Sequence, residues 1–418
     1  MDFSLSEERK MLQETVERFF SSNYKNINQR SENVTLPEGY SKEFWKESSD
    51  LGVISALVSP NFGGLGGGGE DIAIIFELIG KSLCVEPFLS SGILSNTVLS
   101  SISKPQNDLI TLIIEGNLLI SFAHTEMNNR YEDHYIETTA SLKNEEWIIN
   151  GTKSFVINGD NASKIIVSAR INGDVNDKYG IGLFLVNNDS TLKRSYNTID
   201  GYRATELTFE NLKGELLAKD EEALKCVVKA NSAGALALSA EALGIMKICF
   251  DLTLDYLKTR KQFGKPIGAF QSIQHRMVDM MLEIEQVKSA VMLASSTFET
   301  DDITRDKNIS AAKNLVGRVG KLIAEETIQL HGGIAMTWEY SDAHYAKRLI
   351  MIDHLMGDSD YHRDRFKLLS GFQLLTSNIV ALFLKLSGTS IDFLFFKSNK
   401  TATISISIIM SPEASSTM

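Results

Sequence analysis

The spacing of hydrophobic residues divides the chain into three parts, and the first part is helical. Apolar side chains near the N-terminus recur at intervals of three and four residues, which predicts an amphipathic helix: Met11, Leu12, Val16, Phe19 and Phe20. Ser4 followed by Glu7 is a capping-box pattern that predicts the start of this helix. Helical patterns continue over 42–50, 71–81 and 88–101. Residues 1–117 are therefore predicted to form an N-terminal helical domain.

The pattern changes to short alternating runs over residues 118–218. These runs are rich in Ile, Val, Thr and Phe and are separated by turn residues, which is typical of β-strands. Asn150-Gly151 lies between two of the runs, and both residues tolerate positive φ, so this dipeptide predicts a hairpin turn. Several strands at this spacing predict a compact antiparallel β-barrel or sandwich.

Residues 219–370 return to helical periodicity. Four long segments are separated by breaks at Phe263 to Pro266, at Thr300 to Asp302, and at Gly332-Gly333. This arrangement predicts an antiparallel four-helix bundle. The fold class is accordingly α+β and multidomain: an N-terminal helical domain, a central antiparallel β-barrel and a C-terminal four-helix bundle.

An atypical tail, 371–418, follows the bundle. From Phe372 onward it is rich in Ser, Ile, Phe and Thr and carries few charges. Lys385 and Asp392 interrupt its most apolar part, so no unbroken apolar run reaches the roughly 18 residues of a membrane span. Two interpretations stay open, an appended or misread C-terminus and a membrane anchor, and the first is favoured.

Composition excludes several classes of function. The formal net charge is -11 and the sequence pI is near 5.3, which argues against a general nucleic-acid or anionic-membrane surface. Cys84, Cys226 and Cys249 show no spacing typical of a disulfide framework or a zinc site, so no metal is expected. No basic region followed by an apolar one is visible at the N-terminus, and we expect a cytoplasmic protein.

Three motifs carry a family resemblance. The stretch 259–271 reads TRKQFGKPIGAFQ, 329–333 reads QLHGG, and 150–153 reads NGTK. Together with MDFSLSEE at the N-terminus, they closely resemble the acyl-CoA dehydrogenase family, and the likeness covers roughly residues 1–370 in order. The resemblance implies an FAD cofactor, an acyl-CoA thioester substrate, a dimer or tetramer, and electron-transfer flavoprotein as the acceptor.

The resemblance also implies which residues contact FAD. Arg260 would bind the diphosphate across a subunit boundary, although a basic residue at a helix C-terminus also complements the helix dipole. The remaining implied contacts are Phe270 and Gln271, the run Gln329, Leu330, His331, Gly332 and Gly333, and the flavin-ring stretches with Ala123, Thr125, Phe155 and Ile157. His331 and Phe155 are equally compatible with plain packing. Ile157 stands where the family usually has Thr, so one hydroxyl contact to the ring is missing.

The catalytic base is the clearest departure from the family. The family's carboxylate aligns with Met356, or in other members with Gly234, and neither residue can accept a proton. Glu241 and Asp358 are nearby carboxylates, but each is more often structural in such a position. The sequence therefore leaves the base unassigned.

Four functions remain open. The first is one subunit of a heteromeric acyl-CoA dehydrogenase whose related partner supplies the base, as resemblance to bacterial partner subunits such as the pimeloyl-CoA dehydrogenase small subunit suggests. That likeness rests on Glu126 before Asn129 to Tyr131 and on Met356 to Asp358 before His362-Arg363. The others are a homomeric enzyme with an unrecognised base, a non-catalytic assembly subunit, and a flavin-dependent oxidase or monooxygenase.

Overall fold

The computed structural model describes residues 6–371. The predictions for Ser4 and for the tail from Phe372 onward fall outside the described residues. Within them, Ser6 caps the first helix, because its side chain accepts a hydrogen bond from the Arg9 backbone N–H at 3.3 Å.

The N-terminal part is helical, as predicted. Its elements are α1 (Glu7–Asn23), α2 (Ile27–Thr35), α3 (Lys42–Asp50), α4 (Gly69–Ser82), a π-helical segment (Phe88–Ser95), α5 (Asn96–Ser101) and α6 (Asn107–Ile114). Ser41 caps α3 by accepting the Phe44 N–H, and α4 ends where Leu83 adopts a left-handed conformation at φ 52. The predicted helices over 42–50 and 71–81 are confirmed, and the one over 88–101 is split between a π-helical and an α-helical turn.

The middle part is a β domain. Its strands are β1 (Ile120–Ala123), β2 (Thr139–Lys143), β3 (Glu146–Ile157), β4 (Lys164–Arg170), β5 (Ile181–Asn187), β6 (Leu192–Asn197) and β7 (Arg203–Lys219). The order β4-β2-β3-β7-β5 closes on itself through β4–β5, while β1 joins β4 and β6 joins β7. The sheet is mixed, because β1 pairs with β4 in parallel and one β2–β4 contact is parallel. A long segment follows β1 in place of a tight turn, so β1 is free to align with a distant strand.

The predicted hairpin turn at Asn150-Gly151 is wrong. The turn lies at Asn144-Glu145, whose φ values are 50 and 67, and it joins β2 to β3. Asn150 and Gly151 continue within β3 at a bulge, where the register to β7 shifts. A Cβ on Gly151 would lie 2.7 Å from the Thr138 Cα, so glycine here permits a close strand contact.

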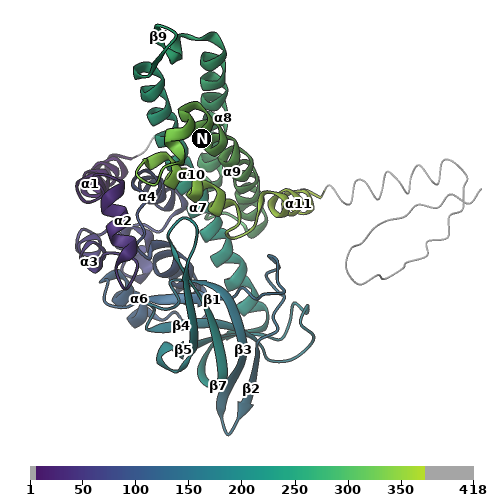
Figure 1. Cartoon of the computed structure of the whole chain (residues 1–418). Helices are drawn as coiled ribbons and strands as arrows, with labels where there is room; N and C mark the ends of the chain where they lie inside the picture. Colours follow the sequence, from purple (N-terminus) through teal and green to yellow (C-terminus); the bar gives the residue numbers. More distant parts are fainter. Residues whose placement is uncertain (1–5, 372–418) are drawn as a thin grey trace, which may run out of the picture. The chain divides into compact units, whose positions relative to one another are not determined.

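The C-terminal part is a helical bundle with the predicted breaks. It contains α7 (Asp220–Thr259), α8 (Gln271–Ser296), α9 (Asp302–His331), α10 (Ser341–Asp353) and α11 (Ser359–Leu369), with a small hairpin of β8 (Lys261–Gln262) and β9 (Lys265–Pro266) between α7 and α8. The 40 residues of α7 make it about 60 Å long. It therefore runs from the β domain to the β8–β9 hairpin at the far end of the bundle (Figure 1).

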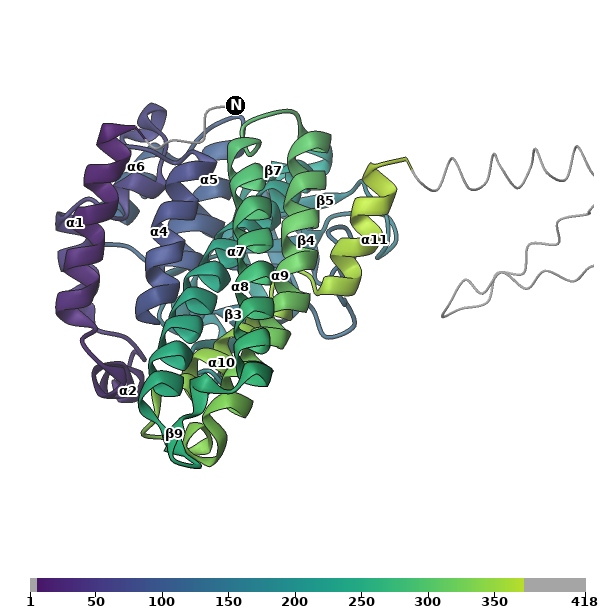
Figure 2. The same cartoon turned by 90° about the horizontal axis from the view of Figure 1, so that it is seen from above.

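Helix α7 is the central packing element. By length and composition it is apolar enough to cross a membrane, but 83% of its most apolar window is buried inside the fold, as expected of a core helix. Figure 2 shows α4 between α1 and α7. Gly80 of α4 and Gly244 of α7 permit this approach, because a Cβ on either would lie 2.0 Å from a backbone oxygen of the other helix.

Candidate functional site

A cavity of about 230 Å³ lies between the β domain and the bundle. Its lining combines residues from the loop that follows β1, from β3 and α7, and from α10, α11 and the turn between them. Cavities at such junctions are common binding sites because side chains from separate elements converge there. Thr125, Phe155 and Met356, which were singled out from the sequence, all line it.

The β wall of the cavity joins the two predicted flavin-ring stretches. The Ser154 N–H donates to the Thr125 carbonyl at 2.9 Å, so the segment after β1 is bonded directly to β3. Phe155 has φ 52 and lies in the irregular part of β3 between Lys153 and Val156. Ile157 lines a smaller inner cavity together with Phe155, Met351 and Leu355, and the last three also line the main cavity. Ala123 is fully buried within β1.

The bundle wall holds Met356 in a defined place. Met356 has φ 54, and its carbonyl accepts a hydrogen bond from His362 Nε2 at 2.8 Å. Burial lowers the pKa of His362 to about 3, so the ring is neutral and Nε2 carries its proton. Lys313, which is fully buried, donates to the carbonyls of Ile352 and Gly357 at 2.9 and 2.7 Å. The turn is therefore fixed from behind.

The two positions expected for a base lie against each other. A Cβ on Gly234 would lie 3.2 Å from Cγ and 3.5 Å from Sδ of Met356. It would also lie 2.8 Å from Leu94 Cδ2. The Met356 thioether thus occupies the space into which a carboxylate from either position would extend. Neither residue supplies a proton acceptor.

The carboxylates proposed from the sequence are engaged elsewhere. Glu241 is 1% exposed and makes two hydrogen bonds with Arg348, from Nε at 2.6 Å and from Nη2 at 2.9 Å. Arg348 also donates to Asp200 at 2.9 Å. Glu241 therefore completes a buried ion pair in the inner cavity, which argues against a role as a base.

Asp358 is held at the start of α11. Its Oδ1 accepts the Tyr361 N–H at 2.8 Å, and its Oδ2 accepts from Arg130 at 2.7 Å. Despite partial burial, this N–H and the Arg130 charge hold the pKa of Asp358 below its usual value. It is a helix cap and an ion-pair partner.

Asp133 is a carboxylate of the cavity lining that the sequence did not single out. Its Oδ1 accepts from Asn231 Nδ2 of α7 at 2.7 Å, and burial raises its pKa. The loop that carries it also crosses to the bundle, where the Tyr131 and Tyr361 rings lie 5.5 Å apart. Asp133 therefore ties the loop to α7.

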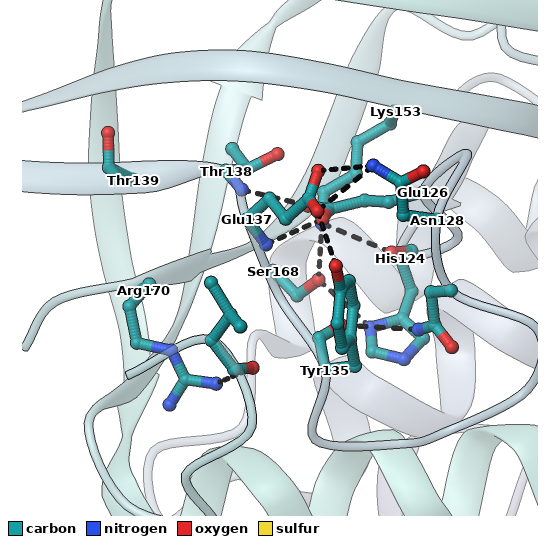
Figure 3. A network of polar contacts seen from close by, with 12 residues as sticks. His124, Glu126, Asn128, Tyr135, Glu137, Thr138, Thr139, Lys153, Ser168 and Arg170 are labelled. Atoms are coloured by element: carbon teal, nitrogen blue, oxygen red, sulfur yellow. Dashed lines mark hydrogen bonds and ion pairs between the residues drawn. The ribbon is translucent and has the colours of Figure 1, made fainter. Parts of the chain in front are cut away.

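A buried polar network lies behind the β wall. Lys153 Nζ donates to the Glu126 carboxylate at 2.7 Å, to Ser168 Oγ at 3.0 Å and to the His124 carbonyl at 3.1 Å (Figure 3). Lys153 is 0% exposed and Glu126 2%. Although burial opposes it, the Lys153 charge keeps the pKa of Glu126 below its usual value. This pair could not be predicted from the sequence, since Glu126 lies in the loop after β1 and Lys153 lies 27 positions later in β3.

Glu86 is the third buried carboxyl group of the inner cavity, after Glu241 and Asp200. Glu86 is 4% exposed, and the Tyr24 hydroxyl lies 2.7 and 2.9 Å from its two oxygens. Burial raises the pKa of Glu86 to about 7. The group was missed in the sequence because a single Glu before Pro87 carries no periodic or spacing signal.

The predicted diphosphate-binding residues lie far from this cavity. Arg260, Gln271, Gln329, Gly332 and Gly333 are exposed around the ends of α7 and α9 and the start of α8, near the β8–β9 hairpin. Gly234 precedes the end of α7 at Thr259 by 25 residues, which corresponds to about 38 Å of helix. The two predicted ends of a cofactor site are therefore separated within one chain.

The other residues predicted to contact FAD at that end of the bundle differ in their exposure. Phe270 is half-buried, and the Lys265 ammonium lies 4.3 Å from its ring centroid. Leu330 and His331 are buried, and His331 Nδ1 donates to the Thr327 carbonyl at 2.9 Å. A Cβ on Gly332 or Gly333 would meet nothing within 4 Å, so the backbone there is open to a ligand.

Comparison with known proteins covers nearly all of the described chain. The models for the acyl-CoA dehydrogenase N-terminal, middle and C-terminal domains match residues 6–107, 121–212 and 225–367. A probable acyl-CoA dehydrogenase of Bacillus subtilis, YngJ, is 27% identical over 353 residues, which are 81% of this chain and 92% of the relative.

Two solved structures share the fold. The ChsE4-ChsE5 complex from Mycobacterium tuberculosis superposes with a TM-score of 0.78 at 20% identity and covers 88% of this chain and 99% of its own. The FAD complex of PigA superposes with a TM-score of 0.78 at 24% identity and covers 89% of this chain and all of its own.

Proposed function

This chain belongs to the acyl-CoA dehydrogenase family of oxidoreductases, and on that premise we propose that it is an FAD-holding subunit that takes its catalytic carboxylate from a related partner. The reaction would be the α,β-dehydrogenation of an acyl-CoA thioester, with electron-transfer flavoprotein as the acceptor. The proposal includes the resemblance to bacterial partner subunits. Assembly with a related subunit has a parallel in the relative described as the ChsE4-ChsE5 complex.

The residues present fit FAD at both ends of the site. Within the described part of the chain, the Thr125 backbone N–H donates to no protein acceptor, and Thr125 lines the cavity. The open backbone at Gly332-Gly333 and the exposed Arg260 suit a diphosphate. When bound, FAD would accept the hydride that leaves the β-carbon of the acyl group. Because the ends lie about 38 Å apart along α7, Arg260 would serve the FAD of a neighbouring subunit.

The observation that carries the proposal is the contact between Gly234 and Met356. Dehydrogenation requires a carboxylate to remove the α-proton, and the Met356 side chain fills the space where one is expected. Glu241 and Asp358 are held in ion pairs, and Asp133 is hydrogen-bonded to Asn231. This chain would therefore seat the ring with Thr125 and Phe155 and leave proton removal to its partner.

The experiment compares two preparations, the chain alone and the chain co-purified with the product of a neighbouring similar gene. Flavin absorbance at the visible maximum is followed while acyl-CoA thioesters of different chain length are added. We expect bleaching with the pair and none with the chain alone. Bleaching by the chain alone would contradict partner dependence, and its loss in Asp133→Asn would then assign the base to Asp133. Absence of flavin from both preparations would instead favour an assembly role.

A further inference from the structure

The back of the cavity wall is organised around one buried ammonium group. Lys153 extends from β3, and its Nζ contacts the His124 carbonyl, Glu126 and Ser168 at 3.1, 2.7 and 3.0 Å. An ammonium has three donors and no acceptor, so these contacts use all of its hydrogen bonds. Burial lowers the pKa of Lys153 to about 8, and the group remains protonated at neutral pH. A full positive charge therefore lies beside the His124 carbonyl, next to the cavity-lining residue Thr125.

The contact to the His124 carbonyl determines where the next N–H points. In a trans peptide the C=O and N–H of one group point in opposite directions. The carbonyl of the His124–Thr125 peptide is directed at Lys153, so the Thr125 N–H is directed away from it. Thr125 is exposed and lines the cavity, and its N–H has no acceptor within residues 6–371. A carbonyl that accepts a hydrogen bond polarises its peptide group, which makes the N–H a stronger donor.

The same ammonium fixes the tautomer of His124. Because Lys153 only donates, Ser168 Oγ accepts from it and is left to donate its own proton to His124 Nδ1, at 2.9 Å. The proton of the ring is then on Nε2, and burial, which lowers the pKa of His124 to about 3, keeps the ring neutral. Within the described residues, His124 Nε2 has no partner either. Two consecutive residues of the wall thus present unpartnered donors.

We propose that Lys153 is a positioning residue, which orients the Thr125 N–H into the cavity and strengthens it as a donor to the acceptor edge of the bound flavin ring. The inference rests on the proposed FAD site and adds a specific role to a residue outside the cavity lining. Negative charge gathers on that edge of a flavin when it is reduced. Lys153 would therefore stabilise the reduced ring more than the oxidised ring and raise its reduction potential.

A purely structural role for the Lys153–Glu126 pair is the competing explanation. Glu126 also accepts the backbone N–H groups of Glu137 and Thr138, at 2.5 and 2.9 Å, so the pair holds the end of β1 to the segment before β2. Removing Lys153 alone would leave a buried carboxylate unpaired and would disturb folding for that reason. A test must separate this effect from the effect on the Thr125 peptide.

The test uses Lys153→Met, the double variant Lys153→Met with Glu126→Gln, and a control at Arg170. The double variant removes both charges and so avoids the unpaired carboxylate. Arg170→Met removes another buried cation of the same domain that donates to backbone carbonyls, those of His134, Val175, Asp177 and Tyr179, none of which lines the cavity. All variants are made in the full chain, in the preparation in which the wild type retains FAD.

We expect the double variant to recover most of the melting temperature that Lys153→Met loses. We do not expect it to recover the FAD affinity or the reduction potential of the wild type. The FAD dissociation constant should rise about tenfold, the scale of one lost hydrogen bond. The two-electron midpoint potential should fall by about 30 mV, which corresponds to a tenfold weaker preference for the reduced ring. Without FAD, amide hydrogen exchange of the segment 120–126 should accelerate in both Lys153 variants and stay unchanged in Arg170→Met.

Three outcomes would overturn the inference. An unchanged potential and flavin spectrum in the double variant would leave Lys153 only a structural role. An equal shift in Arg170→Met would show a general effect of destabilising the β domain. A wild type that retains no FAD in any preparation would overturn the proposed function, while the hydrogen-exchange comparison would still decide whether Lys153 orders residues 120–126.

Discussion

At the scale of single residues, the proposed function identifies Met356 as the position that lacks the catalytic carboxylate. Met356→Glu would place a carboxylate at the cavity wall, on a turn that Lys313 and His362 already hold in place. We expect this variant to bleach its flavin with acyl-CoA in the absence of a partner, at a rate raised about 100-fold or more, the usual contribution of a positioned base. Stopped-flow absorbance with the isolated chain measures the rate.

The matched control is Met356→Gln, which has nearly the same size and cannot accept the proton. Equal rates for the Gln and Glu variants would mean that the side chain at 356 alters access to the cavity and not proton transfer. No bleaching in either variant would mean that a second function, such as thioester binding, is also missing from this chain.

Glu86 makes stability depend on pH. Its pKa is about 7 in the folded protein, raised by burial from the ordinary value of 4.5. The contribution of this group to stability is complete below pH 4.5 and is lost as pH rises through 7, because the folded protein must then bury a charge. The loss reaches about 3 kcal/mol at alkaline pH, at 1.36 kcal/mol for each pKa unit.

Glu86→Gln should remove this loss, since the amide stays neutral beside Tyr24. Urea unfolding at pH 5 and pH 8 measures the effect, and the free energy of unfolding should fall less between these values in the variant than in the wild type. Glu14→Gln is the control, because Glu14 is exposed on α1. An identical pH dependence in wild type and Glu86→Gln would contradict the raised pKa.

At the scale of elements, the crossing of α4 and α7 depends on glycine. Gly244→Ala would place a Cβ 2.0 Å from the Glu77 carbonyl oxygen, and only a separation of the two helices relieves that contact. We expect a loss of about 3 kcal/mol in the free energy of unfolding. Gly320→Ala in α9 is the matched control, because its Cβ would have no neighbour closer than 3.5 Å, and alanine favours a helix by about 1 kcal/mol. Chemical denaturation of both variants gives the comparison, and equal stability would contradict the close crossing.

The elements also show which parts of the fold can be predicted from short stretches of sequence. The breaks between α7, α8, α9 and α10 were predicted because Gly, Pro and Asp end or cap helices through their own backbone preferences. The parallel pairing of β1 with β4 was not predicted, because pairing between strands 44 residues apart depends on the whole sheet. The hairpin turn was predicted at the wrong place because the actual turn, Asn144-Glu145, contains no glycine. Gly151 instead permits a close contact between β3 and Thr138.

The candidate site likewise contains residues that sequence motifs identified and residues that they did not. Thr125, Phe155 and Met356 were found through motifs, and all line one cavity. Lys153 could be read only as part of a hairpin signal, since its partners Glu126 and Ser168 lie on other segments of the β domain. The ion pair between Arg348 of α10 and Glu241 of α7 likewise could not be predicted from helical periodicity.

At the scale of the whole molecule, the length of α7 makes the proposed FAD site a property of an assembly. Arg260 and the Gly332-Gly333 turn lie at the hairpin end, about 38 Å along α7 from Gly234, which contacts Met356 in the cavity lining. Each chain would then contribute the ring-binding part of one FAD site and the diphosphate-binding part of another. FAD would be held only where two chains meet. Because assembly and FAD binding are then linked, retention of FAD must depend on protein concentration.

Dilution tests this linkage directly. We expect free FAD, measured by its fluorescence after ultrafiltration, to increase as the protein is diluted through its assembly constant, and added FAD to shift assembly toward the larger species. Arg260→Met should release FAD at all concentrations while the melting temperature of the apoprotein is unchanged, because the Arg260 side chain is exposed. Lys258→Met, two residues earlier at the same helix end, is the control for loss of positive charge. If FAD retention were independent of dilution and of Arg260, each chain would hold its own cofactor, and the hairpin end of the bundle would have another purpose.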